Sequence, residues 1–255
     1  MNPNHYVRAC AALVSASALS LPAAAADIKL LSAGAFKAVA VALAPAFEQR
    51  TGHRVTIEND TAGALVKRIE GGETFDLVVV PPAAIEALAR AGKVEAGAPT
   101  PLARVAIGVA VKQGAPRPDI GSVAAFRKAL LDAKSVAYID PAAGGSSGIY
   151  LTKLFETMGI SAQIRPKAVL VPGGLVADRV VTGEAELAIH QISEILPVQG
   201  AVLVGPIPAE IQNYTVYAGA VSAAPRDAAA ARAFLAELAG AQARAVLDAR
   251  GMQAP

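Results

Sequence analysis

From residue 27 onward, short runs of aliphatic and β-branched residues alternate with longer segments whose apolar residues recur every three to four positions. The short runs predict strands and the longer segments predict helices. In the first third, strands are expected at 28–32, 53–57 and 75–80, and each is followed by a helix. Further along, the pattern predicts strands at 105–111, 135–139, 168–171, 187–189, 202–204 and 214–220 and helices at 122–131, 147–158, 175–182, 227–239 and 242–249. This alternation predicts an α/β fold built on mostly parallel sheets.

The order of these elements predicts two lobes rather than one continuous sheet. A second α/β unit is inserted into the first, and the chain returns to the first unit near its end. We therefore predict one lobe from residues 27–107 plus 217–255 and a second lobe from 108–216. Two crossing strands, within 103–112 and 213–222, are expected to join the lobes. In this layout a ligand binds between the lobes, at strand carboxyl ends and helix N-termini.

The segment 1–26 has the three parts of a secretory signal peptide. Arg8 provides the positive charge, residues 9–21 form a short apolar stretch, and Ala24-Ala25-Ala26 supplies the small residues of a cleavage site. We therefore predict export to the periplasm. The single cysteine, Cys10, lies inside this segment, so the mature chain is expected to carry no thiol.

Composition narrows the function further. The 255 residues are 54% hydrophobic, and alanine, rather than a membrane-spanning run, accounts for much of the mean hydropathy of +0.43. A formal charge of +2 without a basic block argues against a nucleic-acid partner. There is no dinucleotide glycine pattern and no Walker lysine loop, and only His53 and His190 remain after processing. We therefore predict neither a cofactor nor a metal.

Five loops at predicted strand ends carry the candidate chemistry. All are small or polar, and four of them immediately precede a helix. Helix N-termini present unpaired N–H groups and a partial positive charge, so several of them around one cleft would bind an anion. Each loop alone is also explained by turns and N-caps. The loops are 32–35, 59–63, 144–148, 172–174 and 190–191.

Side chains in and near these loops supply additional donors. Thr61, Ser146, Ser147 and Gln191 are the polar candidates. Two cations, Lys37 in the first predicted helix and Arg179 in a later one, would suit a carboxylate ligand, although both positions also fit solvated helix faces.

A serine hydrolase is an alternative use of the same loops. The run 144–148 matches G-x-S-x-G around Ser146, and Asp178 and His190 follow in hydrolase order. However, that motif needs the serine on a tight turn directly between strand and helix, whereas residues 140–143 intervene here. A helix-capping loop that holds an anion is the better interpretation.

Segments 32–36, 64–72, 75–77, 140–141 and 148–150 resemble the periplasmic molybdate-binding proteins, which are solute receptors of ABC importers. The resemblance covers essentially the whole mature chain in the same element order. It implies a type-2 periplasmic binding fold, in which two hinged lobes close on a small anion.

In that family, hydroxyl and backbone N–H groups hold the oxyanion. The resemblance places Ala35 and Ala62 at two serine positions, Ser147 in the third loop, Gly173 in the fourth and Gln191 at a tyrosine position. The lost hydroxyls would cost a bound dianion about 1–3 kcal/mol per missing hydrogen bond. The smaller side chains also leave room for a larger anion, such as a di- or tricarboxylate. The expected ligand-binding residues are Gly34, Ala35, Lys37, Thr61, Ala62, Ser146, Ser147, Gly173, Gly174 and Gln191.

The segments 190–194 and 204–206 are similar to those of bacterial aconitate isomerase, a secreted branch of the same broad family. This resemblance implies a cleft that binds a tricarboxylate and moves a proton between two carbons. Such a reaction needs a base with a pKa near neutral. His190 is the candidate catalytic residue, because an unperturbed imidazole titrates near pH 7.

Together these observations favour a periplasmic solute-binding protein that captures a small anion, more readily a di- or tricarboxylate than molybdate. Its expected partners are that anion and an inner-membrane ABC permease, and it is expected to act as a monomer. The alternative is an aconitate isomerase-like enzyme that interconverts cis- and trans-aconitate in the same cleft.

Overall fold

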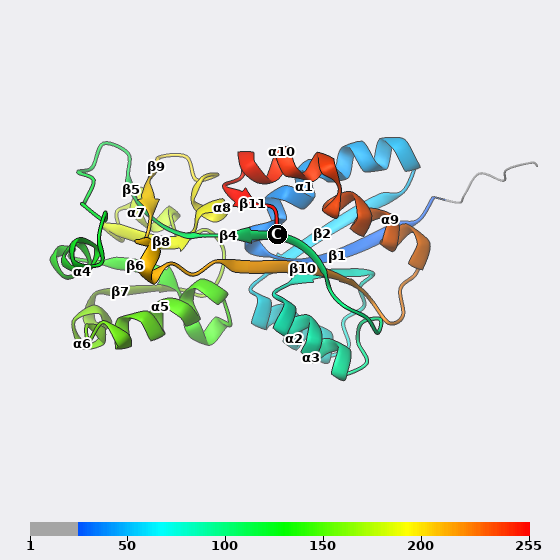
Figure 1. Ribbon diagram of the computed structural model, residues 1–255, viewed down its shortest axis with the longest axis horizontal. Helices are drawn as coiled ribbons and strands as arrows, with labels where there is room; N and C mark the ends of the chain where they lie inside the picture. The colour runs from blue at the N-terminus through cyan, green and yellow to red at the C-terminus, as the bar shows by residue number, and fades with distance from the viewer. Residues whose placement is uncertain (1–24) are drawn as a thin grey trace, which may run out of the picture.

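The structure is a computed structural model that describes residues 25–255. The predicted signal peptide at 1–26 lies almost entirely outside these residues and stays a prediction. Within the described part, two β-sheets flanked by helices form two lobes that lie side by side (Figure 1). The predicted α/β fold with two lobes is confirmed.

The first lobe combines the beginning and the end of the described chain, and the second is built from its middle. The first contains β1 (Asp27–Ala33), α1 (Gly34–Thr51), β2 (Arg54–Asp60), α2 (Ala62–Glu70), β3 (Leu77–Val80), α3 (Pro82–Arg90), β4 (Thr100–Val105), β10 (Thr215–Val221), α9 (Ala228–Ala239), α10 (Ala241–Ala249) and β11 (Met252–Gln253). The second contains β5 (Ile107–Lys112), α4 (Val123–Asp132), β6 (Val136–Ile139), η1 (Pro141–Ala143), α5 (Ser146–Thr157), α6 (Ser161–Ile164), η2 (Arg165–Lys167), β7 (Ala168–Val171), α7 (Asp178–Thr182), β8 (Leu187–Gln191), α8 (Ile192–Ile195) and β9 (Ala201–Pro206), followed by η3 (Ala209–Ile211) on the return path.

Both sheets are mixed rather than mostly parallel. In the first, with the order β11-β4-β10-β3-β1-β2, β1 runs parallel to β2 and β3, whereas β10 is antiparallel to β3 and β4. In the second, with the order β7-β6-β8-β5-β9, β6 runs parallel to β7 and β8, whereas β5 is antiparallel to β8 and β9. The parallel strands come from consecutive βα units, and the antiparallel pairs involve the strands next to the lobe crossings.

The predicted strand at 105–111 is interrupted at Ala106. β4 ends at Val105 in the first sheet and β5 starts at Ile107 in the second, so the chain changes lobes within one residue. The return crossing runs between β9 and β10, over residues 207–214. The two sheets therefore show to which lobe each strand belongs. The exact residues at which one lobe ends and the other begins stay a prediction.

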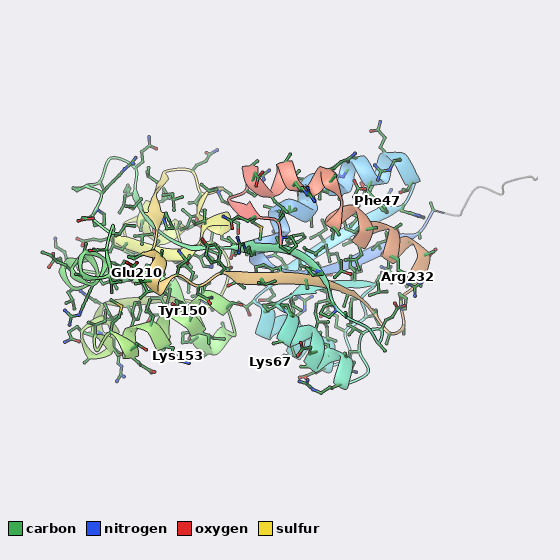
Figure 2. All side chains as sticks on the ribbon, viewed as in Figure 1. Phe47, Lys67, Tyr150, Lys153, Glu210 and Arg232 are labelled. Atoms are coloured by element: carbon green, nitrogen blue, oxygen red, sulfur yellow. The ribbon has the colours of Figure 1, made fainter. Side chains whose placement is uncertain are left out.

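The two crossings are held together by side chains. Gln212 accepts a hydrogen bond from the Ile107 N–H at 2.8 Å through Oε1 and donates to the Ile107 carbonyl at 2.9 Å through Nε2. On the return path, the Tyr150 hydroxyl of α5 donates to the Ile211 carbonyl at 2.6 Å (Figure 2). These bonds satisfy backbone groups at the point where the chain leaves both sheets.

Helices cover both faces of the first sheet: α1, α9 and α10 pack on one face, and α2 and α3 on the other (Figure 1). On the first face, the rings of Phe47 and Phe234 lie 4.9 Å apart (Phe47 is labelled in Figure 2). The strand 77–80 is buried along its whole length, as its continuous apolar run predicts. Among residues 25–255, no helix combines the length and the apolar character needed to cross a bilayer.

Candidate functional site

A cavity lies between the lobes, at the carboxyl ends of the parallel strands. The cavity is small, with a volume of about 40 Å³, which is room for a few water molecules. All five loops singled out in the sequence contribute to its wall, because they follow the carboxyl ends of β1, β2, β6, β7 and β8. The lining residues are Ala33, Gly34, Asn59, Asp60, Thr61, Ala62, Ile139, Gly145, Ser146, Ser147, Gly174, His190, Gln191, Glu194 and Tyr217.

Helix N-termini supply N–H donors at this cavity. Neither Ala33, which caps α1, nor Gly145, which caps α5, makes a side-chain capping hydrogen bond. The first N–H groups of these two helices are therefore free of a side-chain acceptor at their N-caps, and they carry a partial positive charge. At α2, Thr61 caps the helix, and its Oγ1 accepts from the Ala64 N–H at 3.2 Å. The arrangement suits an anion.

Direct contacts join the lobes beside the cavity. The Gly63 N–H donates to the Gly144 carbonyl at 3.1 Å, and the Thr61 hydroxyl donates to the Ala143 carbonyl. The two glycines approach so closely that a Cβ on Gly63 would lie 2.8 Å from the Gly144 Cα. The cleft is therefore closed in this structure.

A buried histidine and a buried glutamate share one wall of the cavity. His190 lies in β8 and Glu194 in α8, and His190 Nε2 is 3.4 Å from Glu194 Oε2. Burial lowers the pKa of His190 to about 3 and raises the pKa of Glu194 to about 8. Both groups are therefore neutral near pH 7. The expectation that His190 titrates near neutrality was wrong, because desolvation disfavours the imidazolium ion.

The other acidic residue in the cavity wall is Asp60 at the end of β2. Its Oδ2 lies 3.8 Å from Arg68 Nη1, so a cation on α2 partly balances its charge. Because Glu194 is neutral near pH 7, the wall does not present two full negative charges to a bound anion.

Gln191 and Tyr217 connect the lobes deep in the cavity. Gln191 Nε2 donates to the Tyr217 hydroxyl oxygen at 2.8 Å, and both side chains are buried. Burial raises the pKa of Tyr217. The hydroxyl group therefore keeps its proton over the physiological pH range and can donate it to a ligand.

The structure brings together most, but not all, of the predicted site residues. Ala35 is buried inside the first lobe and Lys37 and Gly173 are exposed, and none of these three lines the cavity. Arg179 is also elsewhere, in an ion pair with Glu184 at 3.0 Å. The predicted residues that do line it are Gly34, Thr61, Ala62, Ser146, Ser147, Gly174, His190 and Gln191.

Two lining residues that carry titratable groups, Glu194 and Tyr217, were not among the site residues predicted from the sequence. Glu194 lies four positions after His190, in a polar segment at the end of a predicted strand. This position could have indicated that Glu194 belongs to the site. Tyr217 had no such signal, because β10 returns to the cavity from far along the chain.

The G-x-S-x-G run has a packing explanation. Ser146 is the first residue of α5, and η1 separates it from β6. A Cβ at Gly148 would lie 2.1 Å from the Ile139 carbonyl oxygen, so glycine is required where α5 approaches β6. Asp178, the acid of the hydrolase alternative, is not among the described residues that line the cavity. Residues 25–255 also contain no cluster of three or more His, Cys, Asp or Glu side chains that could hold a metal ion.

Two α/β lobes closed on a cavity rich in helix N-termini define a solute-binding protein. The chain belongs to the bacterial extracellular solute-binding protein family, whose model matches residues 28–253. Among curated relatives, the aconitate isomerase of a Pseudomonas species is 35% identical over 232 residues, which cover 89% of this chain and 87% of that protein.

Solved structures show the same fold. The periplasmic molybdate-binding protein of Azotobacter vinelandii superposes with a TM-score of 0.75 at 20% identity, over 89% of this chain and 99% of that chain. The sulfate-binding protein SubI of Mycobacterium tuberculosis gives a TM-score of 0.71 at 19% identity, over 90% of this chain and 87% of that chain. The resemblance to molybdate-binding proteins is thereby confirmed at the level of the fold.

Proposed function

We propose that this protein binds a tricarboxylate in the cavity between its lobes and interconverts cis- and trans-aconitate by moving a proton between two carbons. The observation that carries the proposal is the buried Glu194 carboxyl group beside His190 in the cavity wall. A site that only holds an oxyanion needs hydrogen-bond donors, which a protonated Glu194 also supplies, but it does not need a group that both releases and takes up a proton. A proton-transfer enzyme needs one.

The remaining lining residues suit the carboxylate groups of such a substrate. The N–H groups at the starts of α1 and α5 and the Ser146, Ser147 and Gln191 side chains offer hydrogen bonds from several directions. These donors stabilise anionic carboxylates without a cation in the lining. The same donors would stabilise the charge that spreads into the carboxylates when a carbon-bound proton leaves.

The relative with the name aconitate isomerase supports this choice of substrate, since it aligns over most of both chains. The proposal also includes secretion to the periplasm, action as a monomer and no cofactor. The reaction is a proton shift within one molecule, so it needs neither an oxidant nor a second substrate.

The second candidate is a receptor that captures a di- or tricarboxylate for an ABC permease. It is favoured by the direct contact between Gly63 and Gly144, which joins the lobes beside the cavity, as the closure of a capture protein on its ligand requires. Proton transfer is absent from this candidate, so turnover separates the two.

The test uses the purified chain and cis-aconitate, with proton NMR following the appearance of trans-aconitate. Conversion at a rate proportional to protein concentration supports the isomerase. Stabilisation against thermal unfolding by tricarboxylates, about 2.7 kcal/mol at a ligand concentration 100 times Kd, without any conversion supports the receptor instead. If neither conversion nor stabilisation occurs with aconitate, citrate or succinate, the carboxylate site itself is wrong.

A further inference from the structure

We propose that Glu194 is the catalytic residue that carries the substrate proton, and that His190 is a positioning residue behind it. The inference rests on the proposed isomerase function and moves the role of the base, predicted from the sequence for His190, to Glu194. It stands on the exposure of the two side chains, on the space beside Gly34 and on the hydrogen bonding of His190.

Glu194 has the more open position in the pair. Its side chain is 11% exposed and that of His190 is 2% exposed, although both line the cavity. A group that removes a carbon-bound proton must reach that proton directly or through one water molecule. Of the two groups, the carboxyl group is the more accessible and therefore the better placed to meet this condition.

Gly34 provides the space for the carboxyl group. A Cβ at this position would lie 2.5 Å from Glu194 Oε1, so a larger residue would push the carboxyl group away. Gly34 is also the first residue of α1, where a carboxylate of the substrate would bind. Oε1 therefore lies next to the expected position of the substrate.

His190 faces the other carboxyl oxygen of Glu194, Oε2. Its Nδ1 is buried and has no hydrogen-bond partner among the described residues. A buried N–H without an acceptor is less tolerated than a lone pair without a donor, which favours the tautomer with the proton on Nε2. Nε2 then faces Oε2 at 3.4 Å. The imidazole thus orients the carboxyl group and leaves Oε1 free to exchange a proton.

The surroundings of the carboxyl group contain few charges. The titratable groups that face it are His190 of β8, Tyr217 of β10 and, across the cavity, Asp60 of β2. On α1, which packs against α8, Lys37 is exposed and does not line the cavity. On β5, Lys112 lies at the end of the strand away from α8, and β9 carries no charged residue. Burial therefore dominates, and it raises the pKa of the carboxyl group while lowering that of the imidazole. The group with the higher pKa is the stronger base.

The reaction balances with one proton carrier. The Glu194 carboxylate takes a proton from the methylene carbon, and the electron pair of that C–H bond forms a new C=C bond. The electron pair of the former C=C bond takes the proton back from the Glu194 carboxylic acid at the far carbon. The conformation about the CH2–C single bond at the moment the proton leaves sets the geometry of the new C=C bond, so a cis substrate held in the appropriate conformer gives the trans product, and the enzyme ends in its starting state.

The test compares Glu194→Gln with His190→Gln in the full chain. Glu194→Gln keeps the shape of the side chain but cannot exchange a proton, so kcat should fall by about 10²–10⁴-fold while tricarboxylate binding persists. His190→Gln can still donate to Oε2, so it should keep most of kcat and displace the midpoint of the pH profile. A purely structural role for His190 would leave that midpoint unchanged.

The pH dependence provides a second readout. In the wild-type protein, kcat should rise with pH as Glu194 loses its proton, while tricarboxylate binding weakens over the same range because the site gains a negative charge. In Glu194→Gln, binding should become independent of pH in this range. Calorimetric titration in buffers of different ionisation enthalpy measures the proton uptake directly.

Glu210→Gln is the matched control, because Glu210 is an exposed glutamate on η3, away from the cavity (Figure 2). Circular dichroism checks folding, and Glu194→Asp replaces any Glu194→Gln protein that does not fold. Turnover that survives Glu194→Gln, or that is lost equally in His190→Gln, overturns the inference while the isomerase proposal stands. A wild-type protein without turnover overturns both.

Discussion

Gly63 and Gly144 meet across the cleft with no side chain between them, and the Gly63 N–H donates to the Gly144 carbonyl at 3.1 Å. The approach is reciprocal, since a Cβ on Gly144 would lie 2.7 Å from the Gly63 Cα. Gly144 also has a φ of +75°, a conformation that disfavours any other residue, whereas Gly63 lies within α2. Gly63 is thus the position at which closure can be altered without backbone strain.

We expect Gly63→Ala to weaken closure while leaving the lobes folded. Its added methyl group meets backbone atoms of the other lobe, and overpacking of this kind costs about 1–3 kcal/mol. Small-angle scattering should show a larger radius of gyration, and tricarboxylate Kd should rise by about tenfold or more. Gly205→Ala is the control, because a Cβ there would meet only Ile120 at 3.8 Å. An unchanged radius of gyration and Kd would show that this contact does not control closure.

Gly34→Ala should reduce turnover without preventing folding. The new Cβ would lie 2.5 Å from Glu194 Oε1, and the flexible end of the glutamate can move away from it. We therefore expect kcat to fall by about tenfold or more, because a misplacement of about 1 Å can cost about 10²-fold. Steady-state kinetics and circular dichroism measure the two effects. Full activity in this variant would contradict the assigned position of the proton carrier.

Asp76 should make stability sensitive to acid. Burial alone would raise its pKa, but hydrogen bonds from the Arg226 side chain and from the Lys29 and Arg226 N–H groups lower it overall. A carboxylate with a pKa below its unfolded value stabilises the fold above the unfolded pKa of about 3.9. That contribution is lost as the pH falls through the folded pKa.

Asp76→Asn should lower the free energy of unfolding at pH 7 by about 1.5–3 kcal/mol, the range for a hydrogen bond to a charged group. The difference from wild type should shrink below about pH 4. Urea denaturation of both proteins at several pH values measures this difference in the free energy of unfolding. Asp132→Asn, in the exposed pair with Lys128, should cost well under about 1 kcal/mol. A constant difference from pH 7 to pH 3 would disprove the linkage.

Lys29, Glu58, Arg68 and Glu73 form an ion-pair network on the first lobe. Hydrogen bonds from Arg68 and then Lys29 lower the pKa of Glu73 to about 2. The side chains are 23–40% exposed, so solvent screens the network. We expect Glu73→Gln to cost about 1 kcal/mol at low salt and less in 1 M NaCl. Chemical denaturation at the two salt concentrations checks this, and a salt-independent loss would point to packing instead.

The pattern of the sequence predicted most of the secondary structure and the positions of the cavity loops. Period-2 and period-3.6 apolar spacing is a local property, and strand ends in βα units meet at one edge by topology. This is why the loops at 32–35, 59–63 and 144–148 were placed correctly at one cavity. The break at Ala106 had no such signal, because the sequence 105–111 reads as one apolar run.

The roles inside the cavity depended on contacts that no local pattern encodes. Lys37 and Ala35 follow Gly34 closely, yet helical rotation turns one to solvent and the other into the core. Tyr217 reaches the site only because β10 returns antiparallel to β3.

By itself the sequence determined the α/β class, the two-lobe order and the convergence of helix N-termini, since each follows from spacing along the chain. Only the tertiary structure decided which groups carry charge, because a pKa depends on burial and on neighbours brought from other elements. His190 and Glu194 show the difference: their sequence gives two ordinary titratable residues, and the closed lobes make both neutral.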